Sequence, residues 1–139
     1  MDTESTFDDL LTFHHVGLLV DDITVSIEHY AALVGKKNIS APIFVASQKV
    51  NVCFVKTGTD SYIELVEPTE EGSIVSKLLK KRVSYYHVAY KVKDIHAVVT
   101  RLEALHYKAM ELFNSEAFDG KLCVFLFTPE AHLIELIEQ

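Results

Sequence analysis

The sequence predicts an α+β fold in which two βαβββ modules place their sheets side by side and leave a concave inner face. The first observation is a repeat: a histidine, an apolar strand, an aspartate and an isoleucine occur in this order over residues 15–23 and again over residues 87–95. The second is a glutamate within an apolar strand, over residues 62–67 and again over residues 133–138. The two offsets, 72 and 71 residues, keep step, so the same set of elements is predicted twice.

Composition limits the class of protein. With 139 residues, 49% of them hydrophobic, and only 3 prolines, the chain is predicted to be packed and globular. A formal net charge of −7 argues against nucleic acid or an anionic membrane as partner, because both need a basic surface. The sequence has no apolar run near the roughly 20 residues that span a bilayer and no signal-peptide pattern, so a cytoplasmic location is expected. Cys53 and Cys123 lie in apolar runs and are expected to be buried, reduced thiols.

The first module is predicted over residues 12–68, after an N-terminal tail over residues 1–11. Its first strand is almost continuously apolar, which is typical of a strand covered on both faces. Asp21 and Asp22 can cap the helix that follows, because a short carboxylate accepts hydrogen bonds from the first N–H groups of a helix. The predicted elements are a strand over residues 13–20, a helix over 24–33, and strands over 43–46, 50–56 and 61–67, the last two forming a hairpin.

A linker over residues 69–83, with a short helix at 73–81, precedes the second module at residues 84–139. The pattern then restarts, with Asp94 as the predicted helix cap and apolar residues at helical spacing after it. The predicted elements are a strand over residues 85–92, a helix over 95–105, a weak strand over 108–112, a loop over 113–120, and strands over 121–127 and 132–137.

Four residues stand out because they are polar and lie within apolar strands. Alternate residues of a strand share a face, so each of these side chains is expected to have apolar neighbours. Burying a carboxylate there costs several kcal/mol unless it is paired, hydrogen-bonded or bound to a metal. The four are His15, Glu64, His87 and Glu135. By the same alternation, His14, Glu67 and Glu138 are expected on the opposite faces of their strands, with the two glutamates as surface or strand-end charges.

Several motifs in this order resemble the vicinal oxygen chelate superfamily, which includes glyoxalase I and methylmalonyl-CoA epimerase. The resemblance covers residues 13–138 and is nearest to methylmalonyl-CoA epimerases and lactoylglutathione-lyase-like proteins. It implies a fold of paired βαβββ modules that form a metal-containing cup. The motifs are His14-His15-Val16-Gly17, Glu64-Leu65-Val66-Glu67-Pro68, the helix at 73–80, Tyr86-His87-Val88-Ala89-Tyr90 and Leu133-Ile134-Glu135-Leu136.

The resemblance also implies a cofactor and a catalytic residue. One divalent ion is expected, held by His15, Glu64, His87 and Glu135, and imidazole with carboxylate ligands suits Zn, Co, Ni, Mn or Fe. Glu135 is the expected base. The family's epimerases often have glutamine where Glu64 stands, whereas glyoxalase I has glutamate. Epimerases also use a second acid/base before the hairpin, but residues 47–52 contain no carboxylate.

Candidate substrate contacts are less specific. Gln48 and Asn51 lie in the stretch that corresponds to that second acid/base and can orient a substrate. Tyr62 shares a strand face with Glu64, and His132 lies in the turn before the last strand. A basic cluster, Lys77, Lys80, Lys81 and Arg82, is read as a solvated helix face or as a contact for an anionic ligand.

The predicted function is a divalent-metal-dependent isomerase or lyase that removes a proton next to a carbonyl or thioester. The expected substrate is a small molecule, such as an acyl-CoA or a glutathione adduct, and the resemblance implies a homodimer. One alternative is a ring-cleaving dioxygenase or a fosfomycin-type thiol transferase; a dioxygenase centre uses two histidines and one carboxylate, and Glu64 adds a second carboxylate. The other alternative is a non-catalytic binding protein of this fold.

Overall fold

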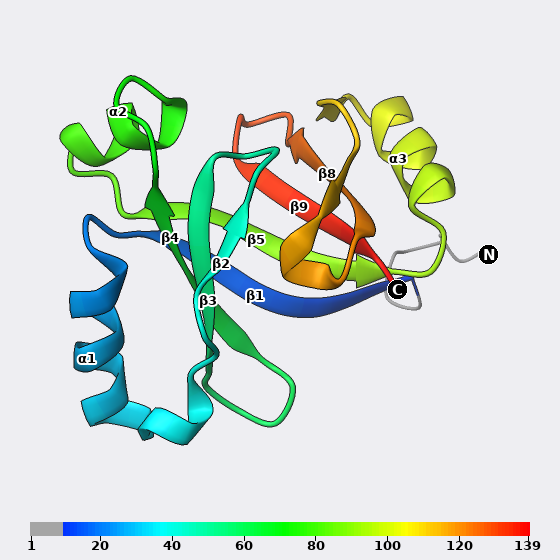
Figure 1. Ribbon diagram of the computed structural model, residues 1–139. Helices are drawn as coiled ribbons and strands as arrows, with labels where there is room; N and C mark the ends of the chain where they lie inside the picture. The colour runs from blue at the N-terminus through cyan, green and yellow to red at the C-terminus, as the bar shows by residue number, and fades with distance from the viewer. Residues whose placement is uncertain (1–9) are drawn as a thin grey trace.

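The computed structural model describes residues 10–139, and in this part of the chain nine strands form one mixed, curved sheet (Figure 1). The strand order is β2-β3-β4-β1-β5-β9-β8-β6, with β7 also paired to β8. The strands are β1 (Leu11–Leu19), β2 (Ile43–Val45), β3 (Val50–Lys56), β4 (Tyr62–Pro68), β5 (Tyr85–Val92), β6 (Lys108–Ala109), β7 (Phe113–Ser115), β8 (Lys121–Phe127) and β9 (Leu133–Glu138). The predicted α+β fold of two βαβββ modules in a curved mixed sheet is confirmed.

The two modules join along their first strands. β1 and β5 pair antiparallel at the centre of the sheet, and each pairs on its other side with the last strand of its own module, β4 or β9, in parallel. In Figure 1 the helices α1 (Ile23–Val34) and α3 (Ile95–Ala104) lie on opposite sides of the molecule, beyond the ends of the central strands. The linker helix α2 (Ile74–Lys80) lies between the modules in sequence.

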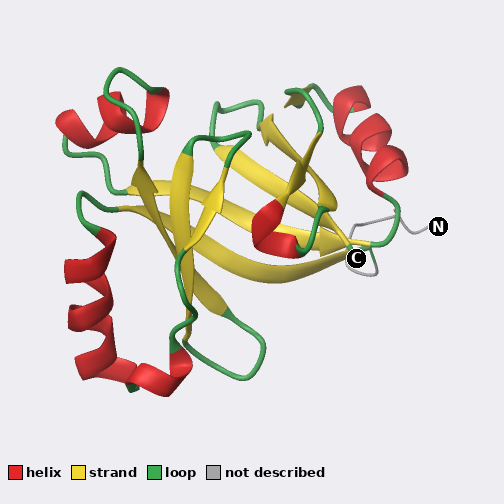
Figure 2. Cartoon of the chain, in the orientation of Figure 1, coloured by secondary structure: helices red, strands yellow, loops and turns green. Residues whose placement is uncertain are grey.

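Differences from the prediction fall at loops and ends (Figure 2). Leu11, predicted to belong to the tail, is the first residue of β1, and the rest of that tail up to residue 9 lies outside the described residues. The predicted strand over residues 108–112 is only two residues long. The predicted loop over residues 113–120 contains β7 and a 3₁₀ turn at Glu116–Phe118, because Phe113–Ser115 extends the sheet along the free edge of β8.

Each long helix is fixed at its start by two carboxylates. Asp22 accepts from the backbone N–H groups of Thr24 and Val25, and Asp94 accepts from that of Ala97, which confirms both as caps. Asp21, also predicted as a cap, makes no hydrogen bond to this helix start; Asp22 takes the position that directly precedes α1.

The second carboxylate comes from the end of a neighbouring strand. Glu67 accepts from Ile23 N at 3.0 Å, and Glu138 accepts from Ile95 N at 3.0 Å. The two glutamates do lie at strand ends, as predicted, but they also contact the helix starts, which the prediction did not include. They satisfy N–H groups that a helix start leaves without an intrahelical partner.

Apolar side chains from both sheet faces complete the core. One cluster lies under α3 and another under α1, where Cys53 is fully buried; Cys123 is also buried, and both cysteines are free thiols, as predicted. In the part of the chain that the structure describes, no helix is long and apolar enough to cross a membrane.

Candidate metal centre

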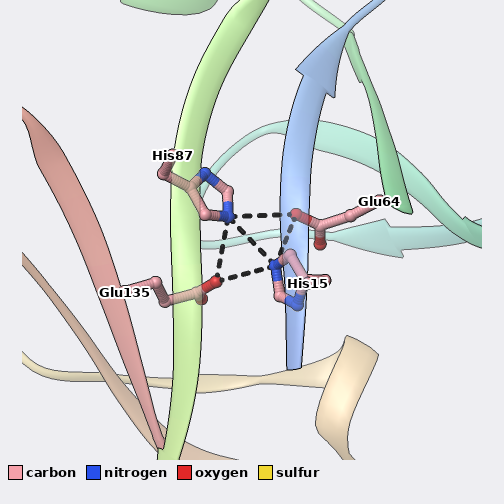
Figure 3. A group of neighbouring side chains, drawn as sticks. All are labelled: His15, Glu64, His87 and Glu135. Carbon is pink, nitrogen blue, oxygen red and sulfur yellow. Dashed lines mark hydrogen bonds and ion pairs between the residues drawn. The ribbon is translucent and has the colours of Figure 1, made fainter. Parts of the chain in front are cut away.

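The four polar residues singled out in the sequence come from the four central strands and meet at one place (Figure 3). His15 of β1 lies opposite Ala89 of β5, and His87 of β5 lies opposite Gly17 of β1, so the two histidines are related by a local twofold. The glutamates follow the same rule, because Glu64 pairs with Gly17 and Glu135 pairs with Ala89. Equal offsets in sequence therefore become equal registers in the sheet.

One atom of each side chain points at a common centre. His15 Nε2 and His87 Nε2 are 3.0 Å apart. Glu64 Oε1 is 3.2 Å from His15 Nε2 and 3.3 Å from His87 Nε2, and Glu135 Oε1 is 3.4 Å and 3.2 Å from the same atoms. All four residues are at most 5% exposed. Figure 3 shows the two carboxylates on either side of the paired imidazoles.

These distances match the ligand shell of a transition-metal ion. Nitrogen and oxygen ligands bind zinc at about 2.0–2.2 Å, so adjacent ligand atoms lie roughly 3.0–3.5 Å apart at ordinary bond angles. The five measured separations, 3.0 to 3.4 Å, fall in that interval. Two neutral imidazoles and two carboxylates also balance the charge of a divalent ion. The residues present therefore fit such a cofactor.

Unsatisfied hydrogen-bonding groups in the cluster also indicate a cation site. Among the buried side-chain atoms described, His87 Nδ1 and Glu135 Oε1 have no hydrogen-bond partner. Glu135 Oε1 lies within ion-pair distance of both histidines, yet neither contact has hydrogen-bond geometry. Buried polar atoms are almost always satisfied. The lone pairs of these nitrogen and oxygen atoms point toward a common centre, where a bound cation would satisfy them.

Electrostatics in the protein without metal are those of two anions facing two bases. Burial alone raises the pKa of Glu64, but the charge and hydrogen bonds of His15 and His87 outweigh it and lower that pKa to about 2. Burial alone lowers the pKa of His87, but its close contacts with the carboxylates of Glu135 and Glu64 outweigh burial and raise that pKa to about 9. The carboxylates of the cluster are therefore held in the ionised form. Positive charge between them stabilises the cluster, and either protons on the histidines or a divalent ion can supply it.

Gly17 makes room for the second histidine. A Cβ added at Gly17 would lie 2.5 Å from His87 Cε1 and 2.8 Å from His87 Nδ1, closer than any real contact. The corresponding residue of the second module, Ala89, has a side chain and is fully buried. The imidazole of His87 therefore lies against bare backbone at Gly17.

The cluster of two histidines and two glutamates lies at the floor of a small cup whose walls are mainly apolar. The space inside measures about 20 Å³, enough for one water molecule or one ion. Glu64 and Glu135 are the carboxylates among the lining residues. The wall residues are Val45, Gln48, Val50, Val52, Val66, Tyr86, Phe113, Ser115, Phe118 and Phe125.

The four candidate substrate contacts are distributed unequally. Gln48 lines the cup. Asn51 does not: its amide donates to Glu67 Oε1 at 3.0 Å on the other face of the sheet, so its prediction as a substrate contact was wrong. Tyr62 lies outside the cup lining and stacks on His14 at 4.8 Å, and His132 is exposed in the turn before β9.

A second cavity, here called the groove, adjoins the cup. It measures about 510 Å³, is mainly apolar, and shares Gln48, Tyr86 and Phe125 with the cup. Its walls come from α2, from the stretch before β3, and from the ends of β8 and β9. They include Lys49, Ile74, Leu78, Val83, Met110, Phe127 and His132. His132 therefore lines this groove and not the cup that contains the histidine and glutamate cluster.

His14 contradicts its prediction. Strand alternation placed it on the face opposite His15, but His14 Nδ1 lies 2.8 Å from His15 Nδ1. The reason is a shift in the β1–β5 register between Phe13 and His15, which leaves His14 without a partner on β5. A bulge of this kind breaks the period of two. The alternation of apolar residues in the sequence does not predict this bulge.

Paired βαβββ modules with two histidines and two glutamates at the centre of a cup define the class of protein. The chain belongs to the Glyoxalase/Bleomycin resistance protein/Dioxygenase superfamily, whose family model matches residues 14–127. This confirms the resemblance to the vicinal oxygen chelate superfamily. A search of curated proteins found no match.

Solved structures with the same fold include several methylmalonyl-CoA epimerases. The enzyme from Mycobacterium tuberculosis is 27% identical with a TM-score of 0.79, over 93% of this chain and 89% of that one. A variant of the Streptomyces coelicolor enzyme, in complex with 2-nitronate-propionyl-CoA, is 25% identical with a TM-score of 0.80, over 94% and 95%. A methylmalonyl-CoA epimerase in complex with methylmalonyl-CoA and NH₄⁺ is 25% identical with a TM-score of 0.81, over the same shares.

Proposed function

We propose that the protein is a divalent-metal-dependent isomerase or lyase that removes a proton from the carbon next to a thioester carbonyl. The observation that carries this proposal is the convergence of His15, Glu64, His87 and Glu135 on one buried point at ligand-to-ligand distances. A bound divalent ion would polarise the substrate carbonyl as a Lewis acid and so acidify the adjacent C–H.

In this proposal the side chains of the cup divide the work. Glu135 takes the proton, because its carboxylate is held ionised beside the reacting position by His15 and His87. The apolar wall excludes water, which strengthens each electrostatic contact at the floor. Gln48 is placed to hydrogen-bond a polar group of the substrate, since its amide lines both the cup and the groove.

The groove supports an acyl thioester with a long arm, such as an acyl-CoA, as the substrate class. Its volume of about 510 Å³ lies in the range of small-molecule sites, whereas the cup holds little more than the reacting atoms. Its walls suit an apolar chain, and three of the wall residues belong to α2. The same helix also carries Lys77 and Lys80. Cationic side chains near such a groove suit phosphate groups. Two of the similar structures hold CoA thioester ligands or analogues.

The cup favours chemistry with one base over epimerisation with two. Glu64 and Glu135 are its carboxylates, and both are proposed as metal ligands. The wall residues of the cup are valines, phenylalanines, Gln48, Ser115 and Tyr86, and none of them adds a further carboxylate. A proton taken by Glu135 therefore returns from the same side, as in an isomerisation, or is lost with a leaving group.

Solvent exchange tests the proposal directly. The protein, loaded with Zn²⁺, Co²⁺, Ni²⁺ or Mn²⁺, is incubated in D₂O with methylmalonyl-CoA or with the hemithioacetal of methylglyoxal and glutathione, and deuterium at the carbon next to the carbonyl is followed by NMR. We expect metal-dependent exchange that is abolished by chelator and in Glu135→Gln. Exchange that persists with chelator, or none with any substrate and metal, would overturn the proposal.

Two other functions give different results in the same experiments. A ring-cleaving dioxygenase would consume O₂ and stop under strict anaerobiosis, and a thiol transferase would add a thiol to an electrophile without exchange. A non-catalytic binding protein would hold its ligand equally well with chelator present. The homodimer implied by the resemblance stays a prediction.

A further inference from the structure

The pairing of β1 with β5 is interrupted at two symmetry-related places. Phe13 pairs with Tyr90 and His15 with Ala89, which leaves His14 without a partner on β5. On the other strand, His87 pairs with Gly17 and Tyr85 with Leu18, which leaves Tyr86 without a partner on β1. Each module therefore has a bulge at the residue before its histidine. Two consecutive side chains then lie on the same face of the sheet in place of one.

The two bulge residues have different surroundings. His14 stacks on Tyr62 at 4.8 Å and 26°, and contacts the rings of Phe54 and Phe118 edge-on at 5.7 Å and 5.5 Å. This aromatic box brings His14 Nδ1 to 2.8 Å from His15 Nδ1. Tyr86 lies edge-on to its own neighbour, His87, whose Nδ1 has no hydrogen-bond partner among the described residues.

The proton between the two Nδ1 atoms decides which nitrogen of His15 is free. Only one hydrogen fits between two ring nitrogens at this distance, and a neutral imidazole carries its hydrogen on one nitrogen only. If His14 donated, neutral His15 would carry its hydrogen on Nε2, the atom that faces His87, Glu64 and Glu135. If His15 donates, its Nε2 keeps a free lone pair directed at that centre.

We propose that His14 is a positioning residue: it accepts the Nδ1–H of His15 and thereby fixes the ring orientation and the tautomer in which His15 Nε2 can bind a metal ion. Ligand histidines generally need such an outer partner, and its loss typically weakens metal binding. The inference rests on the proposed metal site. It goes beyond it by assigning a role to a residue outside the ligand set and to only one of the two histidines.

Substitutions at His14 can separate the hydrogen bond from the packing. His14→Phe keeps a ring against Tyr62, Phe54 and Phe118 but removes the acceptor, whereas His14→Asn restores an acceptor near the position of Nδ1. Zinc affinity is measured by competition with a chromophoric chelator at fixed pH. We expect His14→Phe to bind Zn²⁺ about 10- to 100-fold more weakly than the wild type, and His14→Asn to recover most of that loss.

A spectroscopic measurement on the unmutated protein makes the test independent of folding of any variant. In ¹⁵N-labelled, zinc-loaded wild type, we expect His15 Nδ1 to carry a slowly exchanging proton and His14 Nδ1 to carry none. A proton bound to His14 Nδ1 overturns the proposal. So does equal zinc affinity of His14→Phe and wild type.

Tyr86→Phe is the matched control, because it alters the equivalent bulge residue without removing a hydrogen bond to a ligand. We expect its zinc affinity to stay close to that of the wild type; a loss as large as that of His14→Phe would assign the effect to cup packing and overturn the proposal. Wild type that binds no divalent metal defeats the proposed function and this inference together. Wild type and His14→Phe that bind equally well defeat the inference alone.

Discussion

Burial is the property that makes His15, Glu64, His87 and Glu135 informative at the scale of single residues. Moving a carboxylate out of water costs several kcal/mol unless other charges compensate for it, and here two carboxylates are buried side by side. The two imidazoles compensate in part, by holding protons or by joining the carboxylates around a cation. Single-residue changes that disturb this balance should therefore affect metal binding before they affect the fold.

Gly17→Ala tests how the cup accommodates His87. A methyl group at this position would overlap the imidazole, which must move to accommodate it. We expect zinc binding to weaken by at least tenfold, because disturbing the groups that orient a metal-binding side chain typically costs 10- to 100-fold in affinity. Ala89→Gly, at the equivalent position opposite His15, removes a side chain and is the control. If Gly17→Ala binds zinc as tightly as wild type, the account of this glycine is wrong.

The metal-free protein should lose stability as pH rises. Burial lowers the pKa of His87, but its close contacts with the carboxylates of Glu135 and Glu64 outweigh burial and raise that pKa from 6.5 to about 9 in the folded state. A folded pKa above the unfolded one stabilises the protein fully below pH 6.5, and this stabilisation disappears as pH rises through about 9.

Urea denaturation in the presence of chelator measures this dependence. We expect the free energy of unfolding of the wild type to decrease between about pH 6.5 and 9, and His87→Gln to show a flatter profile. His96→Asn, at an exposed position of α3, should follow the wild type. A wild-type profile that rises over this interval would contradict the sign.

At the scale of elements, strand ends and helix starts are joined by carboxylates. Asp22 and Glu67 meet the start of α1, and Asp94 and Glu138 meet the start of α3. Because Glu64 and Glu135 lie three residues before Glu67 and Glu138, each last strand both supplies a proposed metal ligand and fixes its module's helix.

Glu138→Ala should show the value of this contact. Removing a carboxylate acceptor from a helix N-terminus costs about 1 kcal/mol, so the free energy of unfolding should fall by that amount while zinc affinity changes little. Glu103→Ala, on the exposed surface of α3, is the matched control and should be nearly neutral. Equal stability of the two variants would show that the Ile95 N–H is satisfied equally well without Glu138.

The regular elements could be predicted from sequence because their apolar patterns have one period. That period also predicted that two histidines and two glutamates lie together, since they recur at equal offsets. It failed at His14, where a bulge changes the face. It placed Glu67 and Glu138 at strand ends but could not predict their partners, which are backbone N–H groups. The orientation of Asn51 could have been predicted. Val50 and Val52 on either side of it are buried, so alternation along the strand directs the Asn51 side chain away from the cup.

At the scale of the whole molecule, the proposed metal centre and the groove adjoin each other on the sheet. The cup and the groove share Gln48, Tyr86 and Phe125, so a substrate whose reactive end enters the cup can extend along α2. Residues of α2 line the groove on one side of the cup, so the proposed long arm would extend on that side.

Ile74→Glu tests this groove. Ile74 lines it and is 70% exposed, so the substitution should not disturb folding. Loss of apolar contact and repulsion of phosphates together amount to roughly 1.5 kcal/mol, so kcat/KM for a CoA thioester should fall about tenfold, mainly through KM. A short thioester without the nucleotide should be unaffected. Leu33→Glu, equally exposed on α1, is the control; an equal loss in both variants would remove the groove from the substrate site.

The proposed function requires that one metal ion is bound by four side chains from the two modules. Anomalous diffraction at the absorption edge of the metal, on crystals of the zinc- or cobalt-loaded protein, measures this directly. We predict a single strong peak per chain, about 2.0–2.2 Å from His15 Nε2, His87 Nε2 and one carboxylate oxygen each of Glu64 and Glu135. A peak elsewhere, or none among these residues at saturating metal, would contradict it.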